Sequence, residues 1–162
     1  MPCLSIPYDP AIGPLINLIL TPPAVMKQIV TVPGVPPPAG TQPPVFQASA
    51  LIDTGASITS VTATLAAQAA LPLIGKRNLG TAGGVFSANL YVADIAVIFG
   101  SLPAAPPGSQ IAVANLTTAM MENVPVMEFN CASPHFNMLL GRDIICQGIL
   151  SVGFDRRCTF SL

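Results

Sequence analysis

The sequence predicts a mainly β protein with one core. It contains 18 Pro and 13 Gly among 162 residues. The runs between these residues are rich in Val, Ile, Leu, Thr and Phe, which is typical of many short strands. The length is that of one domain. We therefore expect residues 1–162 to form a single domain, from which the Pro-rich stretch Pro33–Pro44 loops outward because its backbone has few donors for a sheet.

Each expected strand is an apolar or β-branched run that ends at Pro, Gly or polar turn residues. The expected strands are Pro14–Leu20, Val25–Val32, Val45–Ile52, Ser57–Val61, Asn78–Thr81, Val85–Phe99, Gln110–Asn115, Val124–Phe129, Asn137–Leu140, Ile149–Phe154 and Arg157–Ser161. Two segments predict short helices instead. Thr62–Ala70 is rich in Ala and stops at Leu71-Pro72, and Arg142–Gln147 lies between two glycines.

The composition limits the possible partners. Hydrophobic residues make up 51% of the chain and charged residues only 8%, against roughly 25% charged in an average soluble domain. So few charges predict apolar surface buried between subunits, or a groove for apolar ligands. The net charge of -1 offers no basic surface for nucleic acid.

Targeting and metal signals are weak. Prolines interrupt the N-terminal apolar runs, no basic segment precedes them, and no run is long enough to span a membrane. We therefore expect a cytoplasmic protein without membrane contact.

Buried free thiols are expected for the four cysteines Cys3, Cys131, Cys146 and Cys158. Cys131 and His135 are too few ligands for a zinc site.

One acidic residue stands at the end of an apolar strand. In Ala48-Ser49-Ala50-Leu51-Ile52-Asp53-Thr54-Gly55-Ala56-Ser57, Asp53 follows the apolar run. Burying an unpaired carboxylate is costly, so Asp53 either points into a wet loop or shares a proton with a second carboxyl group. Two close carboxyl groups cannot both ionise readily, and such a pair supplies both an acid and a base. Asp-Thr-Gly also suits an ordinary turn.

Asp53-Thr54-Gly55-Ala56 resembles the active-site segment of the retroviral-type aspartic peptidases, the retropepsins. In that family a later apolar-apolar-Gly segment opens a short helix, and Met138-Leu139-Leu140-Gly141-Arg142-Asp143-Ile144-Ile145 is similar to it. Between the two, Lys76–Asp94 forms two strand-like runs around a glycine-rich tip, similar to the retropepsin flap. A plain surface hairpin is the alternative. The resemblance covers about Val45–Leu162 and implies a closed retropepsin-like β-barrel, the acid protease fold, with a flap hairpin and two short helices.

The resemblance also implies a role for individual residues. The implied catalytic residues are Asp53, Thr54 and Gly55. The implied substrate-binding residues are Gly55, Ala56, Ser57, Thr81, Ala82, Gly83 and Gly84. The implied structural supports of the site are Leu139, Leu140, Gly141 and Arg142. No metal and no cofactor are implied.

The chain departs from the viral pattern in three places. Its Pro-rich N-terminal segment, Pro2–Pro44, is longer than that of a minimal retroviral enzyme. The expected helix Thr62–Ala70 is more similar to cellular and bacterial single-lobe members. Ser57 stands where many viral enzymes have an acid that pairs with the helix arginine, so we expect Arg142 to bond Asp143 or a backbone carbonyl.

The catalytic pair requires a second copy of the chain. Pepsin-like enzymes carry two Asp-Thr-Gly or Asp-Ser-Gly turns, whereas here only Asp53 is followed by such a pair. A two-fold homodimer would bring both Asp53 side chains to its axis. We expect the C-terminal strand, Arg157–Leu162, to pair across this interface, because an open edge would favour aggregation.

Three functions remain open from the sequence. The first is an aspartic endopeptidase acting on peptide or protein substrates through general acid and base catalysis. The second is a non-catalytic dimerisation or peptide-binding module with the same fold. The third is a structural β protein with coincidental turns, which predicts a monomer.

Overall fold

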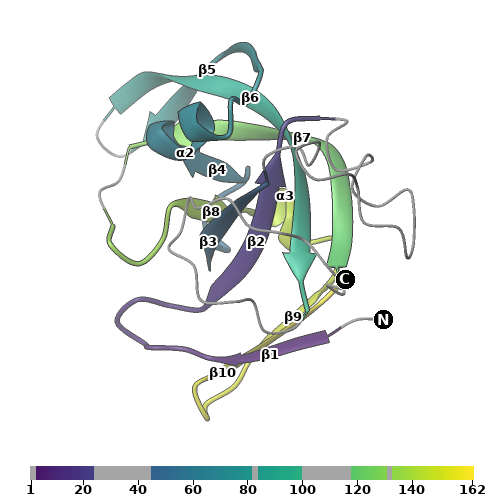
Figure 1. Cartoon of the computed structure of the whole chain (residues 1–162). Helices are drawn as coiled ribbons and strands as arrows, with labels where there is room; N and C mark the ends of the chain where they lie inside the picture. The colour runs from purple at the N-terminus through teal and green to yellow at the C-terminus, as the bar shows by residue number, and fades with distance from the viewer. Residues whose placement is uncertain (1–2, 24–44, 82–83, 100–117, 131–132) are drawn as a thin grey trace, which may run out of the picture.

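The computed structural model describes residues 3–23, 45–81, 84–99, 118–130 and 133–162. The expected strands Val25–Val32 and Gln110–Asn115, and the expected Pro33–Pro44 loop, lie outside these residues. Within them, seven strands form one sheet in the order β2-β3-β8-β4-β7-β6-β5. An additional pairing of β2 with β6 closes six of these strands into a barrel (Figure 1). The prediction of a mainly β, closed-barrel fold is therefore confirmed.

The strands of this sheet come from the whole length of the chain. They are β2 Leu15–Thr21, β3 Phe46–Ile52, β4 Ser60–Thr62, β5 Leu73–Thr81, β6 Gly84–Ile98, β7 Thr118–Phe129 and β8 Met138–Leu140. A second sheet, in the order β1-β10-β9, comprises β1 Cys3–Pro7, β9 Ile149–Val152 and β10 Arg157–Ser161. Two short helices, α2 Ala63–Gln68 and α3 Arg142–Ile145, complete the described elements.

The barrel interior is apolar because alternate residues of each strand point inward. Leu18, Ile95, Val97 and Leu140 are completely buried. The same cluster includes Ile144 of α3, as well as Cys158 and Phe160 of β10. Burial of each large apolar side chain stabilises the fold by roughly 1.5–3 kcal/mol. The second sheet and α3 are therefore attached to the barrel by one continuous core.

Most strand and helix predictions agree with the structure. Two predicted strands are too short, because polar residues and Gly75 break their apolar pattern: β5 begins at Leu73 rather than Asn78, and β7 begins at Thr118 rather than Val124. β4 starts at Ser60 rather than Ser57 because Thr59 is held by side-chain contacts described below. Helix α2 spans Ala63–Gln68 rather than Thr62–Ala70. Thr62 is its N-cap, since the Thr62 hydroxyl accepts a hydrogen bond from the Leu65 N–H at 3.3 Å. β1 was not predicted, because Pro7 closes its short sequence and Pro is tolerated only at a sheet edge.

The cysteine prediction is correct for one residue and wrong for two. Cys158 is buried and free, and burial raises the pKa of its thiol. Cys3 and Cys146 are free but exposed. Cys3 lies on the exposed face of β1 and Cys146 follows the last turn of α3, so neither reaches the core. Cys131 lies outside the described residues.

Over the described ranges, none of the helices has both the length and the apolar character that crossing a bilayer requires.

Candidate active site

Asp53 begins a tight turn at the carboxyl end of β3. β3 runs parallel to β8, with Ile52 opposite Leu140, and the Asp53 N–H donates a hydrogen bond to the Leu140 carbonyl at 3.0 Å. We call residues Asp53–Ala56 the Asp53 turn. Because both supporting strands are interior members of the barrel sheet, the position of the turn is set by the core rather than by a surface loop.

The carboxylate of Asp53 closes its own turn with one oxygen. Asp53 Oδ1 accepts hydrogen bonds from the N–H groups of Gly55 at 2.8 Å and Ala56 at 3.3 Å. The other oxygen, Oδ2, makes no hydrogen bond to the part of the chain that the structure describes. Asp53 is half-buried, while Thr54 and Gly55 are exposed. One carboxylate oxygen is thus available for a water molecule, a second carboxyl group or a substrate.

The Leu139-Leu140-Gly141 segment lies against the Asp53 turn, as the sequence predicted. The Arg142 N–H donates to the Ala56 carbonyl at 2.9 Å. A Cβ atom at Gly141 would lie 2.5 Å from the Ile58 carbonyl carbon and 2.7 Å from the Thr59 nitrogen. Only glycine permits this approach. The start of α3 therefore holds the end of the turn at Ala56, while β8 holds its beginning at Asp53.

A second set of hydrogen bonds joins Thr59 to Asp143. The sequence assigned no role to Thr59 and considered Asp143 only as a partner of Arg142. The Thr59 hydroxyl donates to Asp143 Oδ1 at 2.7 Å, and the Thr59 N–H donates to Oδ2 at 2.9 Å. The same hydroxyl accepts from the Gly141 N–H at 3.1 Å, and the Ile144 N–H donates to Asp143 Oδ1 at 3.0 Å. The acid in the first turn of α3 was the available signal.

Arg142 meets one of its two expected partners, but through its backbone. Its N–H bonds the Ala56 carbonyl, whereas its side chain is exposed. The carboxylate of Asp143 is occupied by Thr59 and Ile144. The expected pairing of Arg142 with Asp143 is therefore replaced by the pairing of Asp143 with Thr59.

The predicted hairpin is present between β5 and β6. Thr81 pairs with Gly84, and the expected site residues Ala82 and Gly83 lie outside the described residues. Gly84 has φ +120°, a conformation that favours glycine. From Gly84 to Asn89, β6 pairs with β5 and with no other described strand. This part of the hairpin extends beyond the barrel, which is the arrangement a lid requires.

A polar cluster lies at the base of this hairpin. Glu128 Oε2 accepts hydrogen bonds from the Tyr91 hydroxyl at 2.7 Å and from Asn89 Nδ2 at 2.8 Å. These bonds, that of Tyr91 first, lower the pKa of Glu128, although partial burial opposes them. Burial and then the bond to Glu128 raise the pKa of Tyr91. We call these three residues the Glu128 cluster, and it joins β6 to β7 where the hairpin leaves the barrel.

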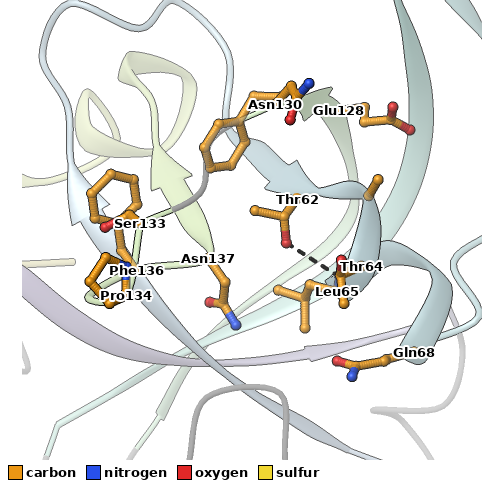
Figure 2. Close-up of a pocket in the computed structure, with 12 residues that line it drawn as sticks. Thr62, Thr64, Leu65, Gln68, Glu128, Asn130, Ser133, Pro134, Phe136 and Asn137 are labelled. Carbon is orange, nitrogen blue, oxygen red and sulfur yellow. Dashed lines mark hydrogen bonds between the residues drawn. The ribbon is translucent and has the colours of Figure 1, made fainter.

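A cavity of about 660 Å³ lies at the opposite end of β8 from the Asp53 turn. It is lined by Thr62 and α2, by the end of β7, and by the segment that leads to Asn137 (Figure 2). Asn137 precedes β8, whereas the carbonyl of Leu140 at the far end of β8 bonds Asp53. None of the predicted site residues lines this cavity. We therefore place the candidate active site at the Asp53 turn, which is open in a single copy of the chain.

Among the described residues, no group of three or more His, Cys, Asp or Glu side chains is placed to hold a metal ion.

The closed six-stranded barrel and the Asp53 turn clamped by Leu139-Leu140-Gly141 define an aspartic protease fold. Residues 42–144 match the model of a protein family described as "Aspartyl protease". The match spans more than half of the chain, and the protein belongs to this retropepsin-like aspartyl protease family. The family resemblance predicted from the sequence is confirmed. No curated protein matches the chain.

Proposed function

We propose that the protein is an aspartic endopeptidase whose active site contains two Asp53 carboxyl groups, one from each copy of a homodimer. The observation that carries this proposal is the Asp53 turn itself. It is fixed by β8 and α3, yet it leaves Asp53 Oδ2 without a partner among the described residues and exposes Thr54 and Gly55. The chain contains no second Asp-Thr-Gly or Asp-Ser-Gly. The other carboxyl group therefore comes from a second copy.

The chemistry follows from the proximity of two carboxyl groups. Like charges held close together do not both ionise, so the pair carries one proton between them. The ionised carboxylate takes a proton from a water molecule, whose oxygen forms a bond to the carbonyl carbon of the substrate. The protonated carboxyl group donates its proton to the carbonyl oxygen. Breakage of the C–N bond then needs a proton on the leaving nitrogen, which the pair supplies.

The surrounding residues have positioning and binding roles in this proposal. Thr54 of each turn bonds the backbone of the other turn and keeps the two carboxyl groups coplanar. Gly55, Ala56 and Ser57 bind the backbone of an extended peptide. The β5–β6 hairpin closes over that peptide with Thr81–Gly84, which requires the open backbone that glycine provides.

Replacing Asp53 by Asn tests the catalytic role. General acid and base catalysis contributes about 10²- to 10⁴-fold, so we expect Asp53→Asn to lower the rate of peptide cleavage by at least that factor. Asp9→Asn is the matched control, because Asp9 Oδ1 also accepts the N–H of the residue two positions later, at 2.9 Å. It should keep the parent rate.

The alternative is a non-catalytic dimerisation or peptide-binding module with the same fold. A dimer that binds peptides but cleaves none of a diverse peptide library, over a wide pH range, would favour this alternative. Cleavage by Asp53→Asn at the parent rate would rule out the proposed mechanism.

A further inference from the structure

We propose that the cavity at the far end of β8 from the Asp53 turn binds a proline-rich segment of a partner protein in the polyproline II conformation. Asn137 lies at this end of β8, whereas Leu140 bonds Asp53 at the other end. The proposed catalytic mechanism uses none of the residues that line the cavity. This second site is therefore independent of peptide cleavage.

The cavity has the size and shape of a ligand site. Its volume of about 660 Å³ lies within the range of roughly 300–1,000 Å³ that is usual for such sites. In Figure 2, Phe136 and Pro134 form one side, and Thr64 and Gln68 of α2 form the opposite side, with Asn137 between them. A ligand that enters the cavity would thus contact apolar rings on one side and polar groups on the other.

Two aromatic rings belong to the apolar side. The rings of Phe129 and Phe136 are nearly parallel, with an angle of 15° between their planes and 6.4 Å between their centroids. Both residues are half-buried, so part of their surface remains open to a ligand. Proline-rich segments bind to grooves lined by aromatic side chains, because the flat apolar surface of the proline ring packs against them.

Asn137 adds a hydrogen-bond donor beside these rings. Its Oδ1 accepts the Ser49 N–H at 3.0 Å, which identifies the other amide atom as the nitrogen. Asn137 Nδ2 has no hydrogen-bond partner in the part of the chain that the structure describes. A polyproline II segment has backbone carbonyls that make no internal hydrogen bonds, and proline has no N–H. The donor of Asn137 therefore matches the groups that such a segment offers.

The position of Asn137 is fixed before any ligand binds. Its N–H donates to the Ser49 carbonyl at 3.0 Å, and its carbonyl accepts the Thr62 N–H at 3.0 Å. The Ser49 hydroxyl also donates to the His135 carbonyl at 2.9 Å. These bonds attach the segment before β8 to β3 and to the end of β4. A site formed in advance loses less entropy on binding, and a polyproline II ligand is also ordered in advance.

The charge of the cavity favours a neutral ligand over an acidic one. Glu128 is the only charged side chain among the described residues that line it. Hydrogen bonds from Tyr91 and Asn89 lower the pKa of Glu128, so its carboxylate is charged at neutral pH. A carboxylate repels acidic segments. A carbohydrate would present hydroxyl groups that need acceptors as well as donors, whereas the free amide atom of Asn137 is a donor only.

Binding of decaproline with blocked, uncharged ends to the Asp53→Asn protein tests the proposal. Isothermal titration calorimetry should show saturable binding. Adding Asn137→Asp keeps an acceptor for the Ser49 N–H but replaces the free donor by an oxygen, so the dissociation constant should rise about tenfold. Asn78→Asp is the matched control, because it makes the same charge change at an exposed position of β5. It should leave the constant unchanged, and equal constants for the two variants would overturn the role of Asn137 and the proposal.

Amide chemical shifts of the Asp53→Asn protein locate the peptide without any change in the cavity. Decaproline should shift the signals of Phe129 and Asn137 and leave that of Gly55 in place. A shift of Gly55 alone, or no binding at millimolar peptide, would overturn the proposal. Shifts of Phe129 and Asn137 with cellotetraose but not with decaproline would overturn it in favour of a carbohydrate site. None of these outcomes depends on peptide cleavage, so the proposed peptidase function is tested separately.

Discussion

The Thr59 hydroxyl group acts both as a hydrogen-bond donor and as an acceptor, and so holds the Asp53 turn against α3. It donates to Asp143 and accepts from the Gly141 N–H. Thr59 is completely buried, so water cannot replace either bond. Asp143 in turn accepts three hydrogen bonds from neighbouring N–H and O–H groups. Thr59 and Asp143 are therefore positioning residues for the turn that carries Asp53.

Replacing Thr59 by Val, which has nearly the same shape, tests this role. The change removes the hydrogen bond that the Gly141 N–H donates and one of the hydrogen bonds that Asp143 Oδ1 accepts. We therefore expect the free energy of unfolding to fall by about 2 kcal/mol. Thr59→Ser keeps the hydroxyl group and should recover most of this loss. Chemical denaturation measures both variants. Equal stability of Thr59→Val and Thr59→Ser would show that the hydroxyl group has no structural role.

The residue scale also shows where sequence reasoning succeeds. Asp53 and Gly141 were identified from short motifs, because a turn and a close backbone approach demand particular residue types at adjacent positions. Thr59 and Asp143 are separated by 84 positions, and only Asp143 belongs to a segment that the motifs single out. Their pairing depends on the alignment of β4 with β8, in which Ser60 lies opposite Leu139. A local pattern marks Asp143 as an acid in the first turn of α3, but it does not identify Thr59 as its partner.

At the scale of elements, the Glu128 cluster fixes the base from which the β5–β6 hairpin extends. Asn89 and Tyr91 lie on β6 and Glu128 on β7. Beyond this point toward the tip, β6 pairs with β5 alone among the described strands. Among the described residues, the cluster thus supplies the hydrogen bonds between β6 and β7 at the point beyond which β6 pairs with β5 alone.

Protonation of Glu128 should weaken the hydrogen bonds that it accepts from Tyr91 and Asn89. The pKa of Glu128 is lowered from its ordinary value of 4.5, so the folded protein favours the charged carboxylate. Its contribution to stability is complete above pH 4.5 and is lost as the pH falls below that value through the lowered pKa. We expect Glu128→Gln to cost about 1 kcal/mol at pH 7, and the difference from the parent should shrink in acid.

Unfolding measured between pH 7 and pH 3 checks this expectation. Tyr91→Phe removes the strongest of the bonds to Glu128 and is the partner in a double-mutant cycle. In that background, Glu128→Gln should have a smaller effect. If Glu128→Gln lowers the free energy of unfolding by the same amount at every pH, the stabilisation does not depend on the charge of Glu128.

At the scale of the whole molecule, most barrel strands were predictable because they contain local apolar runs. The closure of the barrel followed only from the family resemblance, since no local run indicates the pairing of β2 with β6, in which Leu18 lies opposite Val97. β1 was missed for a similar reason, because its five residues become a strand only by pairing with β10 at the other end of the chain. Long-range pairing, rather than local preference, sets these features.

The proposed active site also depends on the whole assembly, because one chain supplies only one Asp53. The low charge content and the exposed Asp53 turn each favour a second copy. If every active site needs one Asp53 from each of two chains, a chain that lacks this carboxyl group should inactivate the partner with which it pairs.

Mixing the parent protein with Asp53→Asn at constant total concentration measures this directly. When half of the chains carry the substitution and the copies exchange freely, random pairing leaves about one quarter of the dimers with two Asp53 residues. A shared Asp53 pair predicts that the rate of peptide cleavage falls to about one quarter of the parent rate. A fall to only about one half would mean that each chain carries a complete site, and would contradict the shared Asp53 pair.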